Sequence, residues 1–165
     1  MLEGQRLDSR VHDCAGFDCG TPALNDYLTR HATQDRRRNL SQVYVLVDSG
    51  DIACVLGYYT LSAAHVDVDQ LADDYRRRLP RYPIPCFRMG RFAVREERQG
   101  QGLGKCLLGC AVDRCLQARQ QVAAYALIVD AKDASAKLFY EYFGFVAFVD
   151  MPFSLYLVLG VRRVW

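Results

Sequence analysis

The sequence has no apolar stretch long enough to cross a membrane, and its N-terminus lacks the hydrophobic segment of a signal peptide. Its seven cysteines form no C-x-x-C pair, and its three histidines are scattered without the spacing of metal ligands. These absences argue against a membrane protein, a redox dithiol and a metal site. We therefore expect a cytoplasmic protein with reduced thiols and no bound metal.

An excess of charge of one sign is also missing. The 21 Lys and Arg residues nearly balance the 19 Asp and Glu residues, which leaves a formal net charge of +2. So small a charge does not by itself indicate nucleic-acid binding, which would have to come from local clusters of arginine. A length of 165 residues with 51% hydrophobic residues, and no repeat or linker, predicts a single domain over residues 1–165.

The pattern of apolar residues predicts an α/β protein with a mixed sheet. Thr21 and Pro22 are typical of a helix start, because a hydroxyl residue precedes proline at the first helical position. The expected elements are a strand near 7–11, a helix over 21–39, a hairpin of 43–47 and 52–62, a short polar helix within 67–82, a strand over 86–94, a helix over 103–116, a strand over 125–129, a helix over 133–142 and two strands over 145–148 and 155–159.

A glycine-rich loop, Gln-Gly-Gln-Gly-Leu-Gly-Lys at residues 99–105, lies between a predicted strand and a predicted helix. Glycine has no Cβ, so a ligand can approach the backbone closely. The first N–H groups of the following helix have no partner within the helix, and that end carries partial positive charge. This arrangement predicts a seat for a phosphate or diphosphate.

Two well-known phosphate-binding patterns do not fit the loop. A P-loop would need glycine in place of Gln99 and a hydroxyl in place of Cys106. A dinucleotide fingerprint would need glycine in place of Lys105, and it belongs near the start of a βαβ unit. The pattern that fits is Q-x-x-G-x-G, formed by Gln99, Gly102 and Gly104, which resembles the pyrophosphate-binding motif of the GNAT acetyltransferases.

A second segment, residues 136–145, carries the same resemblance. Its sequence Ala-Lys-Leu-Phe-Tyr-Glu-Tyr-Phe-Gly-Phe is similar to the A-x-x-F-Y-x-x-x-G-F segment of GNAT enzymes, and one helix and one buried strand separate it from the loop. The resemblance implies the GNAT fold: a central, mixed, mostly antiparallel sheet flanked by helices, with a splayed strand pair that binds acetyl-CoA.

Further segments narrow the resemblance to the GNAT toxins of bacterial toxin–antitoxin pairs, over about residues 14–160. It implies acetylation of the free α-amine of aminoacyl-tRNA, which blocks translation, together with a ribbon-helix-helix antitoxin and a homodimer. The segments are Phe17-Asp-Cys-Gly20, Leu24, Leu28, Val55-Leu-Gly-Tyr-Tyr59, Pro83-Ile-Pro85, Gly90-Arg91 and the glycine loop.

The expected acetyl-CoA site combines the glycine loop with backbone groups of the preceding strand, which would pair with the pantetheine arm. Lys105 could add charge at the phosphates, and it is equally consistent with a solvated lysine in the first turn of the helix. The expected cofactor residues are Phe92, Ala93, Val94, Gln99, Gly100, Gln101, Gly102, Leu103, Gly104, Lys105, Lys137, Phe139 and Phe143.

Tyr140 is the candidate catalytic residue. A phenol with a reference pKa of about 10 can protonate a departing thiolate whose conjugate acid has a pKa of about 8.5. The resemblance implies a general acid at this tyrosine, whereas a packed aromatic with its hydroxyl at the rim is the structural alternative.

No carboxylate stands out as a general base. An α-amine has a reference pKa of about 7.7, against about 10.4 for lysine, so a fair fraction is already neutral at pH 7. The missing base therefore suits an α-amine substrate, while Glu96, Glu97 and Asp130 remain candidates for that role.

Clusters of arginine provide a candidate face for the tRNA backbone. Favourable placement near helix C-termini is the alternative explanation. The remaining functional alternatives are a GNAT enzyme that acts on a small-molecule amine or a protein N-terminus, and a non-catalytic domain that binds coenzyme A or only an antitoxin and DNA. The arginines expected to contact phosphates are Arg36, Arg37, Arg38, Arg76, Arg77, Arg78, Arg81 and Arg91.

Overall fold

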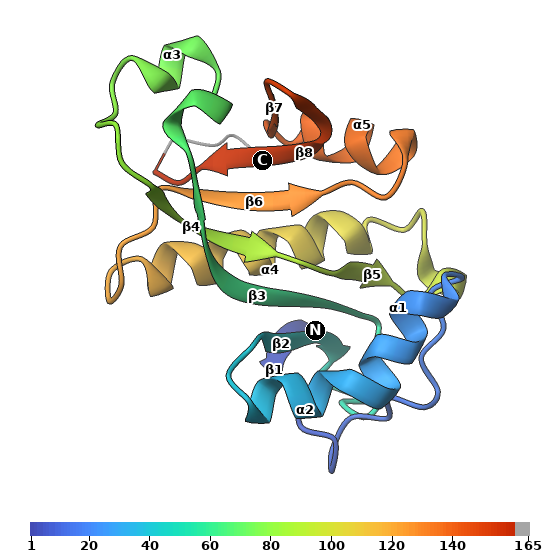
Figure 1. Ribbon diagram of the computed structural model, residues 1–165. Helices are drawn as coiled ribbons and strands as arrows, with labels where there is room; N and C mark the ends of the chain where they lie inside the picture. The colour runs from blue at the N-terminus through green and yellow to red at the C-terminus, as the bar shows by residue number, and fades with distance from the viewer. Residues whose placement is uncertain (161–165) are drawn as a thin grey trace. The chain divides into compact units, whose positions relative to one another are not determined.

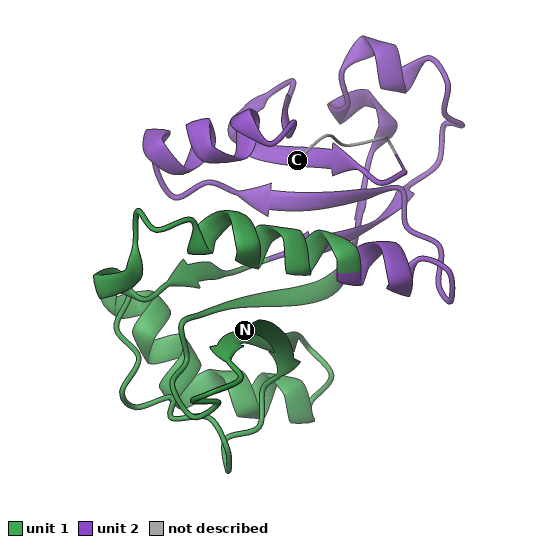
Figure 2. Cartoon of the chain, turned by 180° about the vertical axis from the view of Figure 1, so that it is seen from behind, with its two compact units in different colours: residues 1–62, 90–113 green, residues 63–89, 114–165 purple. Residues whose placement is uncertain are grey.

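Eight β-strands carry most of the apolar segments in the computed structural model, which describes residues 1–160 (Figure 1). The chain divides into two units: unit 1 holds residues 1–62 and 90–113, and unit 2 holds residues 63–89 and the chain from residue 114 (Figure 2). The sheet is mixed and mostly antiparallel, as expected: β4–β6 is a parallel strand pair, whereas β1–β2, β2–β3, β3–β5, β6–β8 and β7–β8 are antiparallel. The single domain stays a prediction, and its last five residues lie outside the described part.

In unit 1, the hairpin predicted from the sequence is confirmed. Strand β2 (Gln42–Asp48) pairs antiparallel with β3 (Gly57–Val66) on one side and with β1 (Leu2–Arg6) on the other. Strand β3 begins five residues later than expected and also pairs antiparallel with β5 (Phe92–Val94). Residues 43–47 of β2 are all buried, which explains why that segment reads as an uninterrupted apolar run.

The first strand lies at residues 2–6, so the prediction of a strand near 7–11 is wrong. Leu7 is buried, but the chain turns at once because the carboxylate of Asp8 accepts the backbone N–H of Arg10 (3.0 Å). The backbone N–H of Asp8 in turn donates to Nδ1 of His12 (3.0 Å). Local side-chain bonds to the backbone of this kind compete with strand pairing.

The helix predicted over 21–39 is confirmed in extent but not in regularity. It runs as α1 (Pro22–Asp26), a π-helical turn (Tyr27–His31) and α2 (Ala32–Arg37), and the left-handed backbone of Asn39 (φ 57°) follows its end. Its apolar side packs against β2 in a core that contains Tyr27, Leu28, Ala32, Val43, Val45, Val47 and Tyr58.

Gly57 allows β3 and β5 to approach closely. A Cβ at this position would lie 2.9 Å from the carbonyl oxygen of Ala93 and 3.1 Å from a side-chain methyl of Leu107 in helix α4 (Leu103–Ala118). The first contact is with backbone, which cannot yield easily. Glycine here therefore fixes the position of β5, and with it the start of the glycine loop.

The strand predicted over 86–94 is two strands. Residues before Gly90 form β4 (Ile84–Met89), which pairs in parallel with β6 (Ala126–Asp130), whereas residues after Gly90 form β5, which pairs with β3. Strand β4 also neighbours β3, so the chain keeps β3 as a partner and ends its pairing with β6 at Gly90. The apolar pattern of the sequence does not reveal this break.

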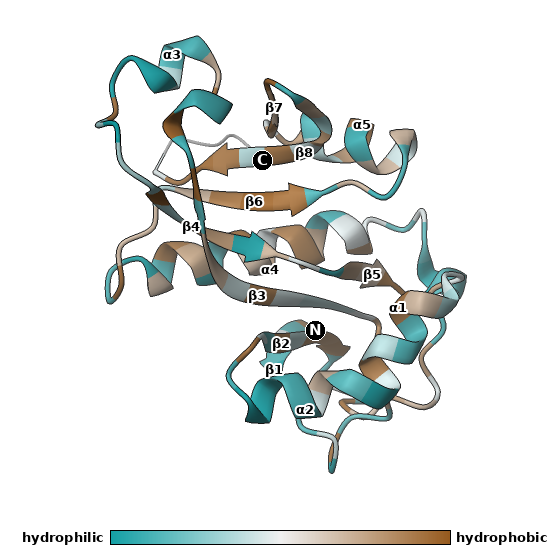
Figure 3. Cartoon of the chain, viewed as in Figure 1, coloured by the Kyte–Doolittle hydropathy of each residue, from teal (hydrophilic) through white to brown (hydrophobic). Residues whose placement is uncertain are grey.

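In unit 2, β6 pairs with β8 (Met151–Val158), which pairs in turn with β7 (Val146–Phe148). Strand β6 is hydrophobic along nearly its whole length (Figure 3). Helix α5 (Ala134–Tyr142) begins as predicted, because the carboxylate of Asp133 accepts the backbone N–H of Ala136 (2.8 Å) at its N-cap.

The polar helix predicted within 67–82 is short. It consists of a 3-10 turn (Val68–Gln70) and α3 (Asp73–Arg76), separated where the backbone N–H of Ala72 donates to the hydroxyl of Tyr156 (2.9 Å). The remaining short turn is the 3-10 turn Glu96–Arg98 before the glycine loop.

Among the described residues, no helix is both long and apolar enough to span a bilayer. The same part of the chain contains no group of three or more His, Cys, Asp or Glu side chains placed to hold a metal ion. All seven cysteines are free thiols.

His12 should make stability depend on pH. It is 4% exposed, and burial lowers its pKa below the usual value of about 6.5. The folded state therefore disfavours the protonated ring, so His12 stabilises the protein fully above pH 6.5 and loses this effect as the pH falls through the lower, folded pKa. The free energy of unfolding should fall by at most about 1.4 kcal/mol per pH unit from this residue.

Denaturant unfolding at pH 7.5 and pH 5.5 measures the effect. We expect His12→Asn to reduce the difference between the two pH values, while His65→Asn, at an exposed histidine, leaves it unchanged. An equal pH dependence in His12→Asn and the parent would contradict the assignment.

Candidate functional site: a glycine loop and a buried tyrosine

The glycine loop has the backbone that a close-bound anion requires. Gly100 and Gly102 have φ angles of 75° and 82°, in the left-handed region that side chains disfavour, and a Cβ at either position would meet nothing within 4 Å. Leu103 then buries its side chain and starts α4, a helix of 16 residues. The loop is therefore open to solvent directly before the N-terminus of a long helix.

Side chains within unit 1 hold the loop in shape. The side-chain amide of Gln99 donates to the carbonyl oxygens of Cys19 (3.1 Å) and Val94 (3.0 Å), and Nε of Arg98 donates to Oε1 of Gln101 (3.0 Å). Gln99 and Gln101 were expected to bind the cofactor. In the structure, their side chains form hydrogen bonds within the protein. Their backbone groups therefore remain to contact a ligand.

The remaining loop and strand positions fit a diphosphate followed by an extended arm. Gly104 and the exposed Lys105 occupy the first turn of α4, where N–H groups and partial positive charge favour an anion. In β5, Ala93 is buried in the core of unit 1, whereas Phe92 and Val94 are half-buried.

Tyr140 lies on α5 in unit 2, and its side chain is almost completely buried. Its ring contacts those of Phe139 (5.4 Å between centroids) and Phe145 (5.3 Å). Burial raises the pKa of Tyr140 well above its usual range, and the negative charge of Asp130 raises it further. The hydroxyl therefore stays protonated at every physiological pH, which is the state that a proton donor needs.

Asp130, at the end of β6, is held from two sides. Its Oδ2 accepts a short bond from Nη1 of Arg88 (2.6 Å), and its Oδ1 accepts the hydroxyl of Ser154 (2.7 Å). With both oxygens engaged, this carboxylate is poorly suited to act as the general base that the sequence left open. Arg88 and Ser154 carry no motif, so sequence reasoning did not find them.

The other cofactor candidates on α5 lie in an aromatic cluster. Phe139 packs edge-on against Phe143 (5.0 Å), which is buried at the end of the helix. Lys137 is half-buried, with its ammonium 5.5 Å from the ring of Phe153 and 4.0 Å from the carboxylate of Glu141. This weak ion pair leaves the ammonium available to a phosphate.

The structure sorts the candidate arginines by what they already bind. Arg36 donates to the carbonyl oxygen of Leu7, and Arg76 pairs with Asp73 (2.6 Å). Arg91 stacks its guanidinium on the ring of Tyr27, with 3.6 Å from Cζ to the centroid. The exposed members of the set are Arg37, Arg38, Arg76, Arg77, Arg78 and Arg81.

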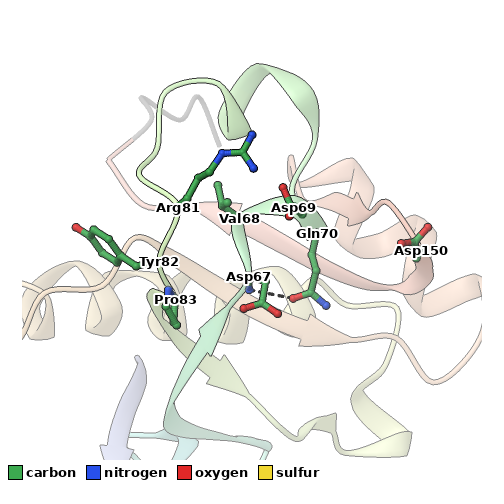
Figure 4. Close-up of a pocket in the computed structure, with 8 residues that line it drawn as sticks. All are labelled: Asp67, Val68, Asp69, Gln70, Arg81, Tyr82, Pro83 and Asp150. Atoms are coloured by element: carbon green, nitrogen blue, oxygen red, sulfur yellow. Dashed lines mark hydrogen bonds between the residues drawn. The ribbon is translucent and has the colours of Figure 1, made fainter.

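Arg81 lines a polar cavity of about 310 Å³ in unit 2 (Figure 4). Asp67, Asp69 and Asp150 line the same cavity, and Asp67 is fixed there by a backbone N–H that donates to Gln70 (3.1 Å). Three carboxylates against one arginine give the lining of this cavity an excess of negative charge, which opposes a phosphate, so Arg81 is a weaker candidate than its place beside the triplet suggested.

Gly102 and Gly109 provide a matched test of the loop conformation. Both have open space around the position of a Cβ, but Gly109 lies inside α4, whereas Gly102 has positive φ. Gly102→Ala should lower the free energy of unfolding by about 1 kcal/mol through backbone strain. Gly109→Ala should raise it by up to about 1 kcal/mol, because alanine favours the helix. Thermal or denaturant unfolding measures both, and a stabilising Gly102→Ala would show that the left-handed turn is absent.

Comparison with known proteins gives the family. Residues 39–147 match the model of the acetyltransferase (GNAT) domain. The chain is 32% identical to the tRNA-acetylating toxin of Mycobacterium tuberculosis (strain ATCC 25618 / H37Rv), over 96% of this chain and 93% of that protein.

Solved structures agree with this match. The structure of AtaT complexed with acetyl-methionyl-tRNAfMet has a TM-score of 0.88 at 30% identity, and covers 96% of this chain and 95% of its own. A mutant AtaT toxin bound to acetyl-CoA and the C-terminus of the antitoxin AtaR has a TM-score of 0.81 at 29% identity, with 96% and 93% coverage. The predicted fold and enzyme class are therefore confirmed: the chain is an N-acetyltransferase that belongs to the GNAT family.

Proposed function

We propose that this acetyltransferase uses acetyl-CoA to acetylate the α-amine of the amino acid on aminoacyl-tRNA, and so blocks translation as a toxin. The observation that carries the proposal is similarity along nearly the whole chain, 96% of it, to a tRNA-acetylating toxin. The structural similarity of this chain to AtaT, which was solved in complex with acetyl-methionyl-tRNAfMet, supports the same class of substrate.

Acetyl-CoA supplies an acetyl group activated as a thioester. Its diphosphate would bind the backbone N–H groups of the loop from Gln99 to Lys105, because the left-handed glycines expose them and the helix terminus favours negative charge. Backbone groups of β5 would orient the pantetheine arm. The contribution of Lys137, Phe139 and Phe143 stays a prediction from the sequence. The acetyl-CoA complex of the related AtaT supports this choice of cofactor.

Tyr140 would hold the proton that the departing thiolate takes up. Its raised pKa keeps the hydroxyl protonated, and it also makes proton loss costly unless a strong acceptor develops beside it. A thiolate whose conjugate acid has a pKa of about 8.5 is by itself too weak a base to take this proton, so the transfer would have to be coupled to breakage of the thioester bond. Proton transfer would therefore accompany thiolate departure, and would not precede it.

An α-amine substrate fits the shortage of bases. Glu96 and Glu97 are exposed in a charged turn, and Asp130 is engaged by Arg88 and Ser154. An amine with a pKa of about 7.7 can lose its proton to water near neutral pH, whereas lysine at about 10.4 would need help.

The same relatives support part of a proposed biological setting. An antitoxin would neutralise this enzyme, as the complex of AtaT with AtaR suggests, and we propose that it has a ribbon-helix-helix fold. We further propose that the enzyme acts in the cytoplasm as a homodimer.

Tyr140→Phe tests the proton donor. Purified protein is incubated with acetyl-CoA and charged tRNA, and N-acetyl-aminoacyl product is measured. The parent should form product, and Tyr140→Phe should lower kcat by about 100-fold or more, because general acid catalysis contributes a factor of that size. Tyr142→Phe, an exposed tyrosine on the same helix, is the matched control and should keep parental activity.

Each outcome of this assay has one meaning. If the parent acetylates a small amine or a peptide N-terminus offered in place of charged tRNA, but does not acetylate charged tRNA, the proposed substrate is wrong. Full activity in Tyr140→Phe would remove Tyr140 from the mechanism while leaving the substrate in place.

Gly104→Glu tests the loop. A carboxylate in the first turn of α4 should repel the diphosphate, so acetyl-CoA binding should be lost in isothermal titration calorimetry. Gly109→Glu adds the same charge further along the helix, where a Cβ meets nothing within 4 Å, and should still bind. Equal affinities of the two variants would place the diphosphate elsewhere.

A further inference from the structure

Arg91 is held more firmly than the exposed candidate arginines. Its backbone N–H donates to the hydroxyl of Thr60 (3.0 Å), and its carbonyl oxygen accepts the N–H of Thr60 (3.1 Å), which fixes it to β3. Its guanidinium lies on the ring of Tyr27 at 3.6 Å. These contacts lie within unit 1, and they restrain both the backbone and the side chain of Arg91.

The ring of Tyr27 is itself immobile. It is 4% exposed, and its hydroxyl donates to Oδ2 of Asp35 (3.0 Å). Two rings lie beside it, those of Tyr58, stacked at 6.3 Å and 15°, and His31, at 6.3 Å and 32°. Tyr58 is anchored in turn by a bond from its hydroxyl to the carbonyl oxygen of Leu24 (2.6 Å). Tyr27 therefore offers a fixed aromatic surface at the first residue of the π-helical turn.

The stacked guanidinium keeps its hydrogen-bond donors for a ligand. Within residues 1–160, no acceptor is bonded to the guanidinium of Arg91, whereas Arg36 and Arg95 donate to backbone carbonyls and Arg76 pairs with a carboxylate. Stacking covers a face of the planar group and leaves its N–H edges free. Those edges match the geometry of a phosphate.

We infer that Tyr27 is a positioning residue, which holds Arg91 so that its guanidinium binds a backbone phosphate of the RNA substrate. This inference rests on the proposed function. The physical reason is preorganisation: a stacked arginine has already lost most of its side-chain freedom, so little more is lost when it binds. The exposed arginines at the helix ends lack this advantage.

The test measures the Kd for charged tRNA at several salt concentrations by fluorescence anisotropy. Arg91→Gln should weaken binding about tenfold, the effect expected for one charge-assisted contact. The slope of log Kd against log salt should fall by about 0.7 to 0.9, because one fewer counterion is released. Arg10→Gln removes an exposed arginine of unit 1 that already pairs with Asp8 (2.9 Å), and it should leave both values unchanged.

Variants of Tyr27 and Arg91 separate positioning from charge. Arg91→Lys keeps the charge but loses the planar group, so Kd should rise severalfold with an unchanged salt slope. Tyr27→Phe keeps the ring and should bind like the parent, whereas Tyr27→Leu should weaken binding. In the Tyr27→Leu background, Arg91→Gln should add little, because the contact is already lost.

Two results would overturn the inference. Parental Kd and salt slope in Arg91→Gln would show that no phosphate binds there, and this variant does not depend on a change in the core. Additive effects of Arg91→Gln and Tyr27→Leu, or a parental Kd in Arg91→Lys, would remove the positioning role. Failure of the parent itself to acetylate charged tRNA would instead reject the proposed function.

Discussion

The left-handed turn from β5 into α4 is the constraint on which the candidate site depends. Gly100 and Gly102 take φ angles that other residues avoid, and Gln99 ties the turn to Val94 and Cys19. The backbone is thereby set before any ligand arrives, so a bound diphosphate does not bear the entropic cost of ordering a loop. Gly57 also helps to position the turn, because only a missing Cβ lets β5, which leads into the turn, lie so close to β3.

Buried tyrosines have two different roles in this chain. Tyr140 keeps its proton because burial and the charge of Asp130 both oppose its loss, which suits a donor. The hydroxyls of Tyr27 and Tyr58 bond to Asp35 and a backbone carbonyl, and Tyr27 presents its ring to Arg91. An aromatic residue with a polar tip can thus hold a proton in one unit and a cation in the other.

Motifs with fixed spacing were readable from the sequence, and contacts between distant segments were not. The loop of residues 99–105, the helix start at Thr21 and Pro22, and the segment around Tyr140 were all predicted, because each depends on neighbours along the chain. The break between β4 and β5 at Gly90, where pairing with β6 ends, was missed, because an apolar run does not say which strands it pairs with. The first strand was also misplaced, since the apolar residues Leu7 and Val11 predict a strand that the turn at Asp8 prevents.

The sequence by itself determined the family, the glycine loop and the tyrosine, because residue type and short-range spacing encode backbone freedom and chemical groups directly. Tertiary structure decided which of many similar side chains are available. In the folded chain, Arg36 donates to a carbonyl oxygen and Asp130 accepts from Arg88 and Ser154. Arg81 lines a cavity together with three carboxylates, and Arg91 is stacked on Tyr27 with its donors free. These outcomes depend on partners up to dozens of residues away, and only packing brings such partners together.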